Sequence, residues 1–468
     1  MSTPPPRGIA VVDIGYTNSK LALFDMGLNL IAHRSLASRH VPGPPYPSID
    51  PEPVYEMLRE AMPQFDALLP VDAVVPTAHG AAMALLNQEG GLALPVMDYM
   101  AEPPADLIAE YRRQEPPFSE VFCALLPKAL THALQLHWQE QGWPDGFANA
   151  STILPFIQYA AFRLSGARVS EISSMCCQTQ LMDVRGGGFS SLARARGWDR
   201  RLAPLAKAWA KVGDLRPEFR GTGLRGRSDV LAGVHDSNAN YLRYLAAGLG
   251  EFTLLSTGTW IISFDPSTDL AALDPSRDTS SNTDVLGRQV ATSRFFGGKE
   301  LEIVAGGAPG EAASVTCAAE LIARGSFALP SFTDSGGPLP GTGAKGRYAG
   351  PAAASPEERA SLAALYCALM CDQQLEAAGS RHQIVVDGPF ALNAVFLAVL
   401  AALRPGQPVR ASDLSDGTAT GAAVLGLMTV SGTLPRIGLR LREIQAADLP
   451  GLPAYHAKWL EAAGALRR

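Results

Sequence analysis

The sequence predicts an α/β protein of two domains. Its 468 residues exceed the length of one typical domain, and 47% of them are hydrophobic, so each domain can bury a core of its own. Two segments far apart in the chain, residues 8–25 and 252–264, share one pattern: an apolar run, a small polar turn and a second apolar run. Each is typical of a β-hairpin, and further strand and helix patterns follow both. We therefore expect two halves that open alike.

The composition favours a protein that acts on small molecules. The net charge is −6, and no run of Lys and Arg indicates nucleic-acid binding. The first residues, MSTPPPRG, lack the apolar core of a signal peptide, and no apolar run is long enough to span a membrane. We expect a cytoplasmic protein with no nucleic-acid or membrane partner. The six cysteines have neither the density nor the spacing of a disulfide framework or a zinc site, so we expect them to be buried as apolar residues.

The first hairpin, GIAVVDIGYTNSKLALFD, turns on a group of polar residues. Asp13 ends the first strand, Thr17 and Asn18 supply polar side chains and backbone N–H groups, and Lys20 adds a positive charge. Concave N–H groups and a cation suit phosphate oxygens, and a carboxylate suits Mg²⁺. The turn therefore fits a triphosphate with its magnesium ion, or else an ordinary hairpin turn, in which Asp, Gly and Asn are common.

Two further strand ends in the first half carry titratable groups. A predicted strand over residues 72–76 leads to His79, at the edge where α/β folds often bind ligands. A histidine satisfied within its loop is the alternative. A second strand, from Asp229, leads to His235 and Asp236, and a helix is expected close behind. A carboxylate at this junction can act as a general base, or it can cap the helix.

Between these strand ends the pattern predicts mostly helix. Residues 126–164 are expected to be helical with a break at the glycines near 142, and residues 191–211 are expected to form a basic amphipathic helix with a solvated face. In the second half, Ser355 begins a long helix, because Glu358 completes a capping box, and Gly379 ends it.

The second hairpin, FTLLSTGTWIISF, places Gly258 and Thr259 in its turn. Two phosphate-facing turns in two domains can close on one nucleotide. Further on, Gly388 and Pro389 form a turn before a helix that contains Asn393. This turn can receive an adenine ring above an apolar patch, or it is an ordinary β–α connection. The small residues of DGTATGAA, at 416–423, allow either close packing or the close approach of a ligand.

The motifs DIGYTNSK, GVHDSNAN, LSTGTW, DGPFALN and DGTATGAA, in this order, resemble those of the FGGY carbohydrate kinases. These belong to the superfamily of sugar kinases, actin and heat-shock ATPases. The match runs over nearly the whole chain, and the HDS and STGTW forms look closest to kinases of deoxyketohexoses such as L-rhamnulose and L-fuculose. The resemblance implies two actin-like (ribonuclease H-like) domains, each a mixed β-sheet flanked by helices, with ATP and sugar in the cleft between them. We expect residues 1–240 to form the sugar and phosphate side, and residues 241–468 the nucleotide side.

The resemblance also implies a role for individual residues. Asp236 would be the base that takes the proton from the sugar hydroxyl, and Asp13 would organise Mg²⁺ through water. The remaining carried-over positions are Thr17, Asn18, Lys20, Gly258 and Thr259 for phosphate, Gly388, Pro389 and Asn393 for adenosine, and His79, Gln158 and His235, together with Asp236, for the sugar. At Lys20 the family usually has an arginine, which supplies the same charge.

The function expected from this resemblance is ATP-dependent phosphorylation of a small sugar, such as L-rhamnulose, L-fuculose or a pentulose. One alternative is an ATPase of the same superfamily that acts on a protein partner. Another is a non-catalytic sugar sensor, although Asp13 and Asp236 are both present and no decay of the site is visible. The oligomeric state is open, with a homodimer among the expected assemblies.

Overall fold

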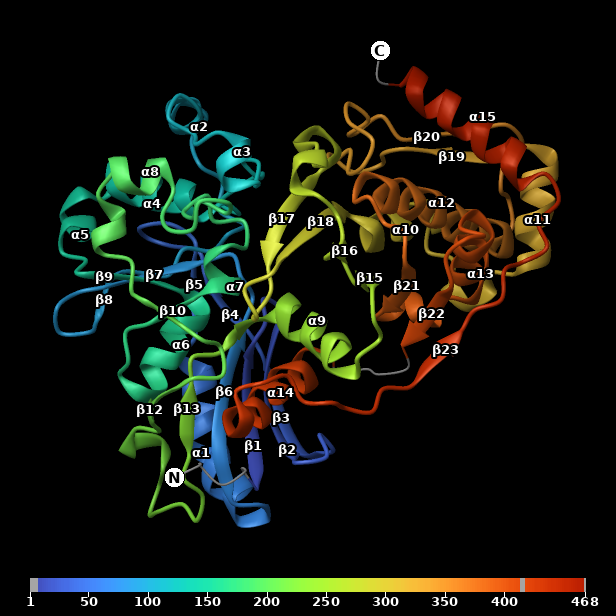
Figure 1. Ribbon diagram of the computed structural model, residues 1–468. Coiled ribbons are helices and arrows are strands. Elements are labelled where there is room, and N and C mark those ends of the chain that lie inside the picture. Colours follow the sequence, from blue (N-terminus) through green and yellow to red (C-terminus); the bar gives the residue numbers. More distant parts are fainter. Residues whose placement is uncertain (1–6, 413–416, 467–468) are drawn as a thin grey trace. The chain divides into compact units, whose positions relative to one another are not determined.

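The computed structural model describes residues 7–412 and 417–466 (Figure 1). They divide into two compact units, and neither unit is one continuous stretch of chain. Unit 1 contains residues 7–248, 282–289 and 417–437, and unit 2 contains residues 249–281, 290–412 and 438–466. Two short segments from late in the chain therefore join the first unit, whereas the expected domains, 1–240 and 241–468, were continuous.

Unit 1 is built on a mixed sheet of seven strands. The strand order is β12-β13-β6-β1-β2-β3, and β14 also pairs with β6. The bounds are β1 (Gly8–Ile14), β2 (Asn18–Asp25), β3 (Leu30–Ala37), β6 (Val71–Ala78), β12 (Lys211–Asp214), β13 (Asp229–Leu231) and β14 (Val234–His235). The strands β1 and β2 form the predicted antiparallel hairpin, while β6 runs parallel to β1 and β14 parallel to β6.

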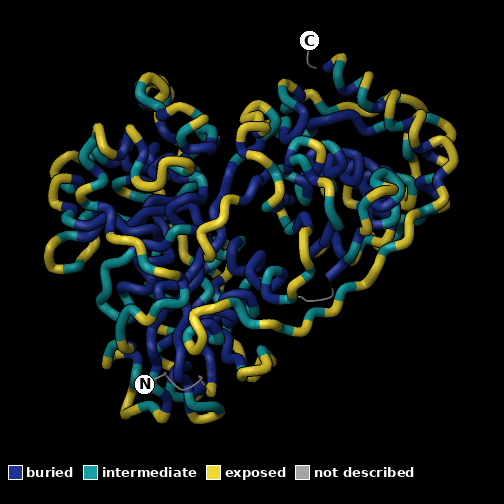
Figure 2. The backbone as a smooth tube through the Cα atoms, in the orientation of Figure 1, coloured by how far each residue is buried: buried dark blue, intermediate teal, exposed yellow. Residues whose placement is uncertain are grey.

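Both faces of this sheet are covered, because side chains along β1 alternate between two cores. Ala10, Val12 and Ile14 pack with residues of α1 and α6, and Ile9 and Val11 pack with residues of α9 and α14. These helices are α1 (Glu52–Leu68), α6 (Phe156–Ser165), α9 (Asp236–Ala247) and α14 (Gly417–Ser431). In Figure 2 the central strands are accordingly dark blue, the colour of buried residues.

The small residues of α14 serve close packing. A Cβ on Gly421 would overlap the carbonyl oxygen of Ala239 in α9, and one on Gly426 would lie 2.7 Å from Ile9 in β1. Of the two interpretations of DGTATGAA, close packing is therefore observed at Gly421. Asp416, the first residue of the motif, lies outside the described residues.

A second layer of unit 1 surrounds a small sheet ordered β8-β7-β9 and has its own hydrophobic core. Its strands are β7 (Met83–Leu86), β8 (Leu92–Leu94) and β9 (Thr152–Pro155), so a strand interrupts the mostly helical stretch expected at 126–164. The helices here are α2 (Ala105–Arg112), α3 (Phe118–Val121), α4 (His132–Gly142), α5 (Pro144–Ala148), α7 (Ile172–Met175) and α8 (Ser191–Ala195). Short strands complete the unit: β4 (Arg39–Val41), β5 (Ser48–Asp50), β10 (Ser170–Glu171) and β11 (Leu205–Ala206).

The prediction of one long helix over residues 191–211 is wrong. Only α8 is helical there, followed by a 3₁₀ turn (Trp198–Arg200) and two short strands. Gly197 has a φ of 70°, the left-handed conformation that ends helices, and Pro204 lacks the N–H that a helix interior needs. The apolar period alone suggested one helix.

Unit 2 contains a second mixed sheet, ordered β17-β18-β16-β15-β21-β22-β23. Its strands are β15 (Phe252–Thr257), β16 (Ile261–Asp265), β17 (Thr279–Thr283), β18 (Gln289–Phe295), β21 (Gln383–Asp387), β22 (Val409–Ser412) and β23 (Leu441–Glu443), and a separate pair is formed by β19 (Phe327–Leu329) and β20 (Arg347–Ala349). Its helices are α10 (Gly297–Ala305), α11 (Val315–Arg324), α12 (Pro356–Ala377), α13 (Ala394–Leu403) and α15 (Leu452–Ala465). The predicted capping box at α12 is confirmed: Ser355 accepts from the N–H of Glu358, whose side chain accepts from the N–H of Ser355.

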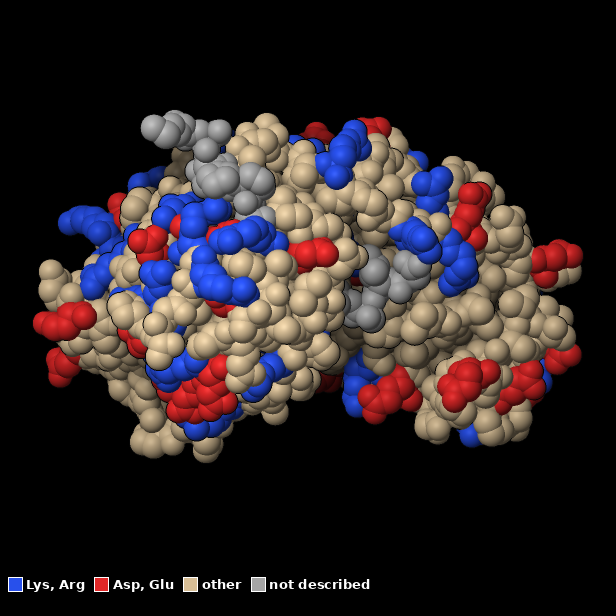
Figure 3. All heavy atoms as spheres, turned by 90° about the horizontal axis from the view of Figure 1, so that it is seen from below, with Lys and Arg blue, Asp and Glu red and all other residues tan. Residues whose placement is uncertain are grey.

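Three general expectations can be compared with this fold. All six cysteines are buried and none of them forms a disulfide, as expected. In the described residues no helix is long and apolar enough to cross a membrane. On the face shown in Figure 3, Lys and Arg side chains lie among Asp and Glu side chains, so the charge on that face is mixed.

Candidate active site

Three strand ends of unit 1 lie side by side. The registers align Asp13 of β1, Thr77 of β6 and Val234 of β14 in one row. Two positions further along each strand come Gly15, His79 and Asp236. Because the three strands are parallel, their carboxyl ends share one edge of the sheet. The first hairpin turn, His79 and Asp236 therefore lie at the same edge of the sheet.

The turn of the first hairpin has a fixed backbone. A Cβ on Gly15 would overlap the carbonyl oxygen of Asn18, so only glycine fits there. The Ser38 hydroxyl donates to the carbonyl oxygen of Gly15 (2.7 Å), and the Ser38 N–H donates to that of Thr17 (3.0 Å). Thr17 and Asn18 are exposed at the tip, and Lys20 lies opposite Asp13 in the β1–β2 register.

Asp236 is the first residue of α9, so the helix expected close behind it begins at Asp236 itself. Its Oδ1 faces three donors: the Ser237 N–H (2.6 Å), the Ser237 hydroxyl (3.2 Å) and Nε2 of His235 (3.0 Å). Within the described part of the chain, nothing donates to Oδ2. Burial raises the pKa of Asp236, but His235 and the Ser237 N–H lower it by more, so the pKa lies below its ordinary value. The side chain is 29% exposed and ionised at neutral pH.

His235 is held from several sides. A Cβ on Gly80 would lie 2.5 Å from its ring, so glycine at position 80 leaves room for the imidazole. The Cys177 sulfur lies 3.7 Å from Nε2, and the side-chain nitrogen of Asn238 lies 3.2 Å from Nδ1. The ring therefore sits between a helix N-terminus, a cysteine and the base candidate.

His79 has polar atoms that the described protein does not satisfy. It is only 7% exposed, and neither ring nitrogen has a hydrogen-bond partner among the described residues. Burial lowers its pKa to about 4, so the ring is neutral near pH 7. Buried polar groups are normally paired, and an unpaired one is a candidate for contact with a ligand.

Four residues next to His79 were missed by the sequence analysis. The ring of Tyr99 lies 5.3 Å from that of His79 and 4.4 Å from that of Tyr16. Asp98 accepts from the Tyr16 hydroxyl (3.2 Å) and contacts Nδ1 of His40 (2.8 Å). Of the four, only Tyr16 lies within a motif, and nothing in the sequence around the other three marks them, because tertiary packing brings them together.

Gln158, the third predicted sugar contact, lies deeper. It is fully buried in α6, and its Nε2 donates to the carbonyl oxygen of Ala232 (3.2 Å), next to β14. Its Oε1 has no partner among the described residues. The observed contact supports the chain that leads into His235.

In unit 2 the second hairpin turn lies at a similar edge. The parallel register of β15 and β21 ends with Ser256 opposite Asp387, so the next residues, Thr257 and Gly388, lie side by side just before Gly258. A Cβ on Gly388, whose φ is 84°, would overlap the carbonyl oxygen of Thr257, and a Cβ on Gly298 would overlap that of Gly258. Thr259 is exposed. Glycines thus allow three backbone segments to converge at this turn.

Beside this turn is a pocket of about 430 Å³. Pro389 and Asn393, both predicted adenosine contacts, line it together with Leu392, which is 82% exposed. The Asn393 side chain caps α13 by accepting from the N–H of Phe396 (2.9 Å). The remaining lining residues are Leu301, Gly310, Glu311, Ala313, Phe390, Ala394 and Val395. The pocket is mostly apolar, as a site for a planar ring should be.

Comparison with known proteins agrees with this architecture. The family description "Carbohydrate kinase FGGY, C-terminal domain" matches residues 249–434. A carbohydrate kinase from Novosphingobium aromaticivorans is 32% identical over 99% of both chains, with a TM-score of 0.86. Xylulose kinase from Rhodospirillum rubrum (17% identity, 98% of both chains, TM-score 0.80) and Plasmodium falciparum glycerol kinase with ADP (12%, 98% of both chains, 0.76) share the fold. A search of curated proteins gave no match.

Two units, each with a mixed sheet flanked by helices, define the class of two-domain actin-like proteins, and the fold expected from the resemblance is confirmed. The chain belongs to the FGGY carbohydrate kinase family. It is a sugar phosphotransferase, and carbohydrate kinases of this family use ATP and a divalent metal ion. These relationships do not favour the two alternatives, a protein-directed ATPase and a non-catalytic sensor.

Proposed function

We propose that this kinase phosphorylates a small ketose, such as L-rhamnulose, L-fuculose or a pentulose, with Asp236 as the base. The observation that carries the proposal is the asymmetry of the Asp236 carboxylate. Oδ1 faces three donors, whereas Oδ2 has none among the described residues. An ionised oxygen with no protein donor, at the edge that also carries the first hairpin turn, is suited to accept the proton of a substrate hydroxyl.

The transfer follows from this arrangement. The sugar oxygen forms a bond to the γ-phosphorus of ATP, the bond from that phosphorus to the bridging oxygen of ADP breaks, and the hydroxyl proton passes to Oδ2 of Asp236. Phosphoryl transfer depends mainly on positioning and charge stabilisation, to which a base adds roughly 10² to 10⁴ in rate. Mg²⁺ bound to ATP supplies part of that charge stabilisation.

The first hairpin turn fits the phosphate side. Lys20 supplies a positive charge, and exposed Thr17 and Asn18 supply donors on a backbone that Gly15 keeps tight. No group of three or more His, Cys, Asp or Glu side chains in the described residues could hold a metal. Asp13 is a single, half-buried carboxylate, and Mg²⁺ is commonly bound by one or two carboxylates with water and substrate phosphates. We assign it the metal role.

In unit 2, Gly258 and Thr259 are proposed to contact phosphate, and the 430 Å³ pocket beside them is proposed to hold adenosine. Gly388 and Pro389 would lie along the nucleoside, with Asn393 at the end of the pocket. The exposed Leu392 side chain offers an apolar surface to the adenine ring.

On the sugar side, His79 and His235 lie at the edge where the reacting hydroxyl must sit, and we add Tyr99 and Asp98 to the proposed contacts. His79 offers ring nitrogens that have no partner in the described part of the chain, and Tyr99 offers an aromatic face and a hydroxyl. We keep Gln158 among the proposed sugar residues. Its side chain donates to the carbonyl oxygen of Ala232, so it would act on the sugar site through that backbone segment. The predicted division into a sugar side (1–240) and a nucleotide side (241–468), the cytoplasmic location and the homodimer remain predictions.

Substrate choice is tested by a coupled assay of ADP release with Mg²⁺ and ATP. The panel contains L-rhamnulose, L-fuculose, L-ribulose, D-xylulose and erythritol, with glycerol and gluconate added because structurally similar proteins are described as kinases of these. We expect one ketose to exceed the others in kcat/KM. Strong turnover of a polyol or an acid sugar, with ketoses silent, would overturn the ketose assignment.

The role of Asp236 is tested by Asp236→Asn. Because the amide keeps the shape and loses the basic oxygen, kcat should fall by at least about 10²-fold. ATP binding, measured by calorimetry, should remain near that of the wild type. Near-normal turnover of the variant would remove Asp236 from the role of base.

A further inference from the structure

A chain of hydrogen bonds leads to the base candidate from a segment far away in the sequence. The segment 282–289, which follows the second hairpin, belongs to unit 1. The Thr283 N–H donates to Oδ1 of Asn282 (2.8 Å), and the same oxygen lies 3.2 Å from the side-chain nitrogen of Asn238 in α9. That nitrogen lies 3.2 Å from Nδ1 of His235. The far ring nitrogen, Nε2, faces Asp236.

The direction of each hydrogen bond in this series follows from the first donor, the Thr283 N–H. A backbone N–H can only donate, so the Asn282 atom that faces Thr283 must be its oxygen. The Asn238 atom that faces this oxygen must then be the NH₂ group, since two carbonyl oxygens would repel each other. This group also faces His235, so Nδ1 must accept and carries no proton. The proton of a neutral ring is then on Nε2, which donates to Oδ1 of Asp236.

We propose that Asn282 and Asn238 are positioning residues for phosphoryl transfer: they hold His235 as a neutral imidazole with its proton on Nε2, and this N–H fixes Asp236 so that Oδ2 meets the sugar hydroxyl. The inference rests on the proposed role of Asp236 as the base. It assigns to His235 the function of orienting the carboxylate, beyond its predicted contact with the sugar.

A second proton on His235 would have to enter at Nδ1, against the Asn238 NH₂ group. Burial disfavours the charged ring, but Cys177 and the Asp236 carboxylate favour it by more, so these interactions alone place the pKa of His235 well above its ordinary value. His79 and His132, which is also fully buried, are the other titratable groups near the ring, and both are held neutral because burial lowers their pKa to about 4. The donor–donor conflict at Nδ1 opposes this preference for the charged ring, and in our proposal it keeps the ring neutral.

A neutral donor has a chemical advantage over a cation here. An imidazolium next to Asp236 lowers the pKa of that carboxylate and weakens it as a base, whereas a neutral N–H fixes the carboxylate without that charge. The same logic explains why Oδ1 collects donors while Oδ2 is left for the substrate. Asparagine is suited to such a chain, since its amide does not change charge with pH.

The test uses ¹⁵N NMR of the imidazole nitrogens in the full-length protein, with the His235 signals assigned through His235→Gln. One-bond and two-bond couplings distinguish a neutral ring protonated on Nε2, a neutral ring protonated on Nδ1 and the doubly protonated cation. We expect wild-type His235 to show the neutral Nε2–H form from pH 6 to 8. A doubly protonated ring, or a proton on Nδ1, at pH 7 would overturn the proposal.

The variant Asn238→Ala removes the donor to Nδ1. We expect His235 to acquire a titration between pH 6 and 8, and kcat to fall about tenfold while the KM for ATP stays unchanged. The control is Asn240→Ala, which removes an asparagine of similar burial (5% exposed, against 1%) from the same helix. It should leave the His235 signals as in the wild type. A structural defect alone would lower activity without changing the protonation of His235, so unchanged signals in Asn238→Ala would refute the positioning role.

The NMR result does not depend on turnover, so the two hypotheses can fail separately. If Asp236→Asn keeps its activity, the base assignment is wrong whatever the state of His235. If His235 is a cation in the wild type while Asp236→Asn is inactive, the base stands and the positioning chain is wrong.

Discussion

At the scale of single residues, the candidate site contains a side chain that lowers the stability of the free protein and is suited to bind a ligand. His79 is the clearest case, because both ring nitrogens are buried without a partner among the described residues. An unpaired buried polar group costs roughly 1–3 kcal/mol, and an apolar residue of similar size does not have this cost. A site that binds a sugar can recover the cost when the sugar hydroxyls bind.

We therefore expect His79→Leu to leave the free energy of unfolding unchanged or to raise it by about 1 kcal/mol, while the KM for the sugar rises about tenfold. Urea unfolding and steady-state kinetics measure the two effects. His33→Gln, at an exposed position on β3, is the control and should change neither. Loss of stability with an unchanged KM would mean that His79 is only a packing residue.

At the scale of elements, glycine controls where backbones meet in unit 2. In α10 the first turn approaches the second hairpin so closely that a Cβ on Gly298 would overlap the carbonyl oxygen of Gly258. Gly298→Ala must move one of the two segments. We expect the KM for ATP to rise at least tenfold, which corresponds to about 1.4 kcal/mol of lost binding. Gly406→Ala, where a Cβ meets nothing within 4 Å, should match the wild type. Equal kinetics for both variants would contradict the phosphate role of this turn.

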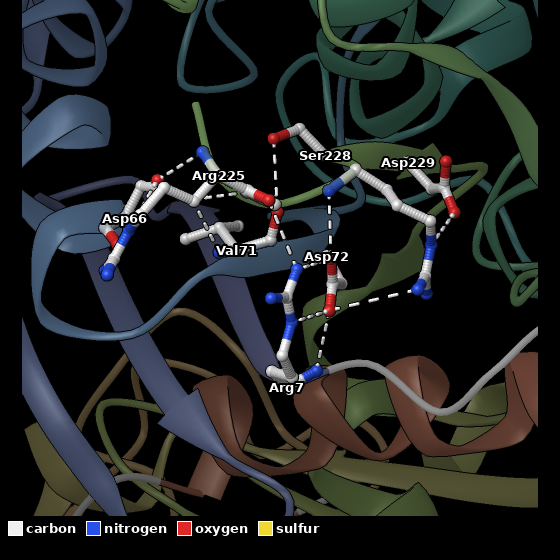
Figure 4. Close-up of polar contacts among 9 residues, drawn as sticks. Arg7, Asp66, Val71, Asp72, Arg225, Ser228 and Asp229 are labelled. Carbon is white, nitrogen blue, oxygen red and sulfur yellow. Dashed lines mark hydrogen bonds and ion pairs between the residues drawn. The ribbon is translucent and has the colours of Figure 1, made fainter. Parts of the chain in front are cut away.

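Ion pairs and hydrogen bonds stabilise the start of β6, at the end of the unit 1 sheet opposite to the candidate site (Figure 4). Asp72 accepts from the N–H and Nε of Arg7, both at 2.9 Å, and from the N–H of Arg227 (2.9 Å). Nearby, Asp66 accepts from the N–H groups of Arg225 (2.6 Å) and Val71 (2.8 Å). These bonds join β1, β6 and the segment that leads into β13.

The Asp72 carboxyl gives unit 1 a predictable acid response. Burial raises its pKa, but the bonds from Arg7 and Arg227 lower it by more, to about 2. A group whose pKa is depressed in the folded state stabilises the protein fully above its unfolded pKa, near 4, and loses this effect as the pH falls through about 2. The contribution is about 2 kcal/mol.

In denaturant unfolding, Asp72→Asn should be less stable than the wild type at pH 6, and the difference should shrink toward pH 2. Asp106→Asn, at an exposed position in α2, should show no such convergence. A difference that is the same at both pH values would exclude this linkage.

At the scale of the whole molecule, local patterns predicted local structure and failed where distant segments meet. Both hairpin turns and the Ser355 capping box were predicted, because their signals lie within a few residues. The helix expected at 191–211 failed because Gly197 and Pro204 outweighed the apolar period. Asp98 and Tyr99 could not be recognised, since packing against Tyr16 and His79 defines their role.

Prediction of the two units from the sequence had the same limit. Hairpin repetition predicted two halves, but no local signal shows that residues 282–289 and 417–437 leave the second half of the sequence to join unit 1. These segments include the closely packed helix α14 and Asn282, which contacts Asn238 next to His235. Sequence reasoning from one chain finds motifs, and three-dimensional contacts decide which motifs act together.

The proposed assignments predict that each ligand protects a different unit. The adenosine pocket is lined by residues of unit 2, whereas His79, Tyr99 and Asp236 belong to unit 1. In hydrogen exchange, ADP alone should slow the amides of residues 389–395 and 310–313, and the sugar alone should slow those of 79–80, 98–99 and 235–237, because a ligand stabilises the state that it binds. Helix α15 lines no proposed site and should exchange at the same rate with either ligand. If ADP alone protected the sugar residues and left 389–395 unchanged, the nucleotide would have to bind unit 1, and the division into a sugar side and a nucleotide side would be wrong.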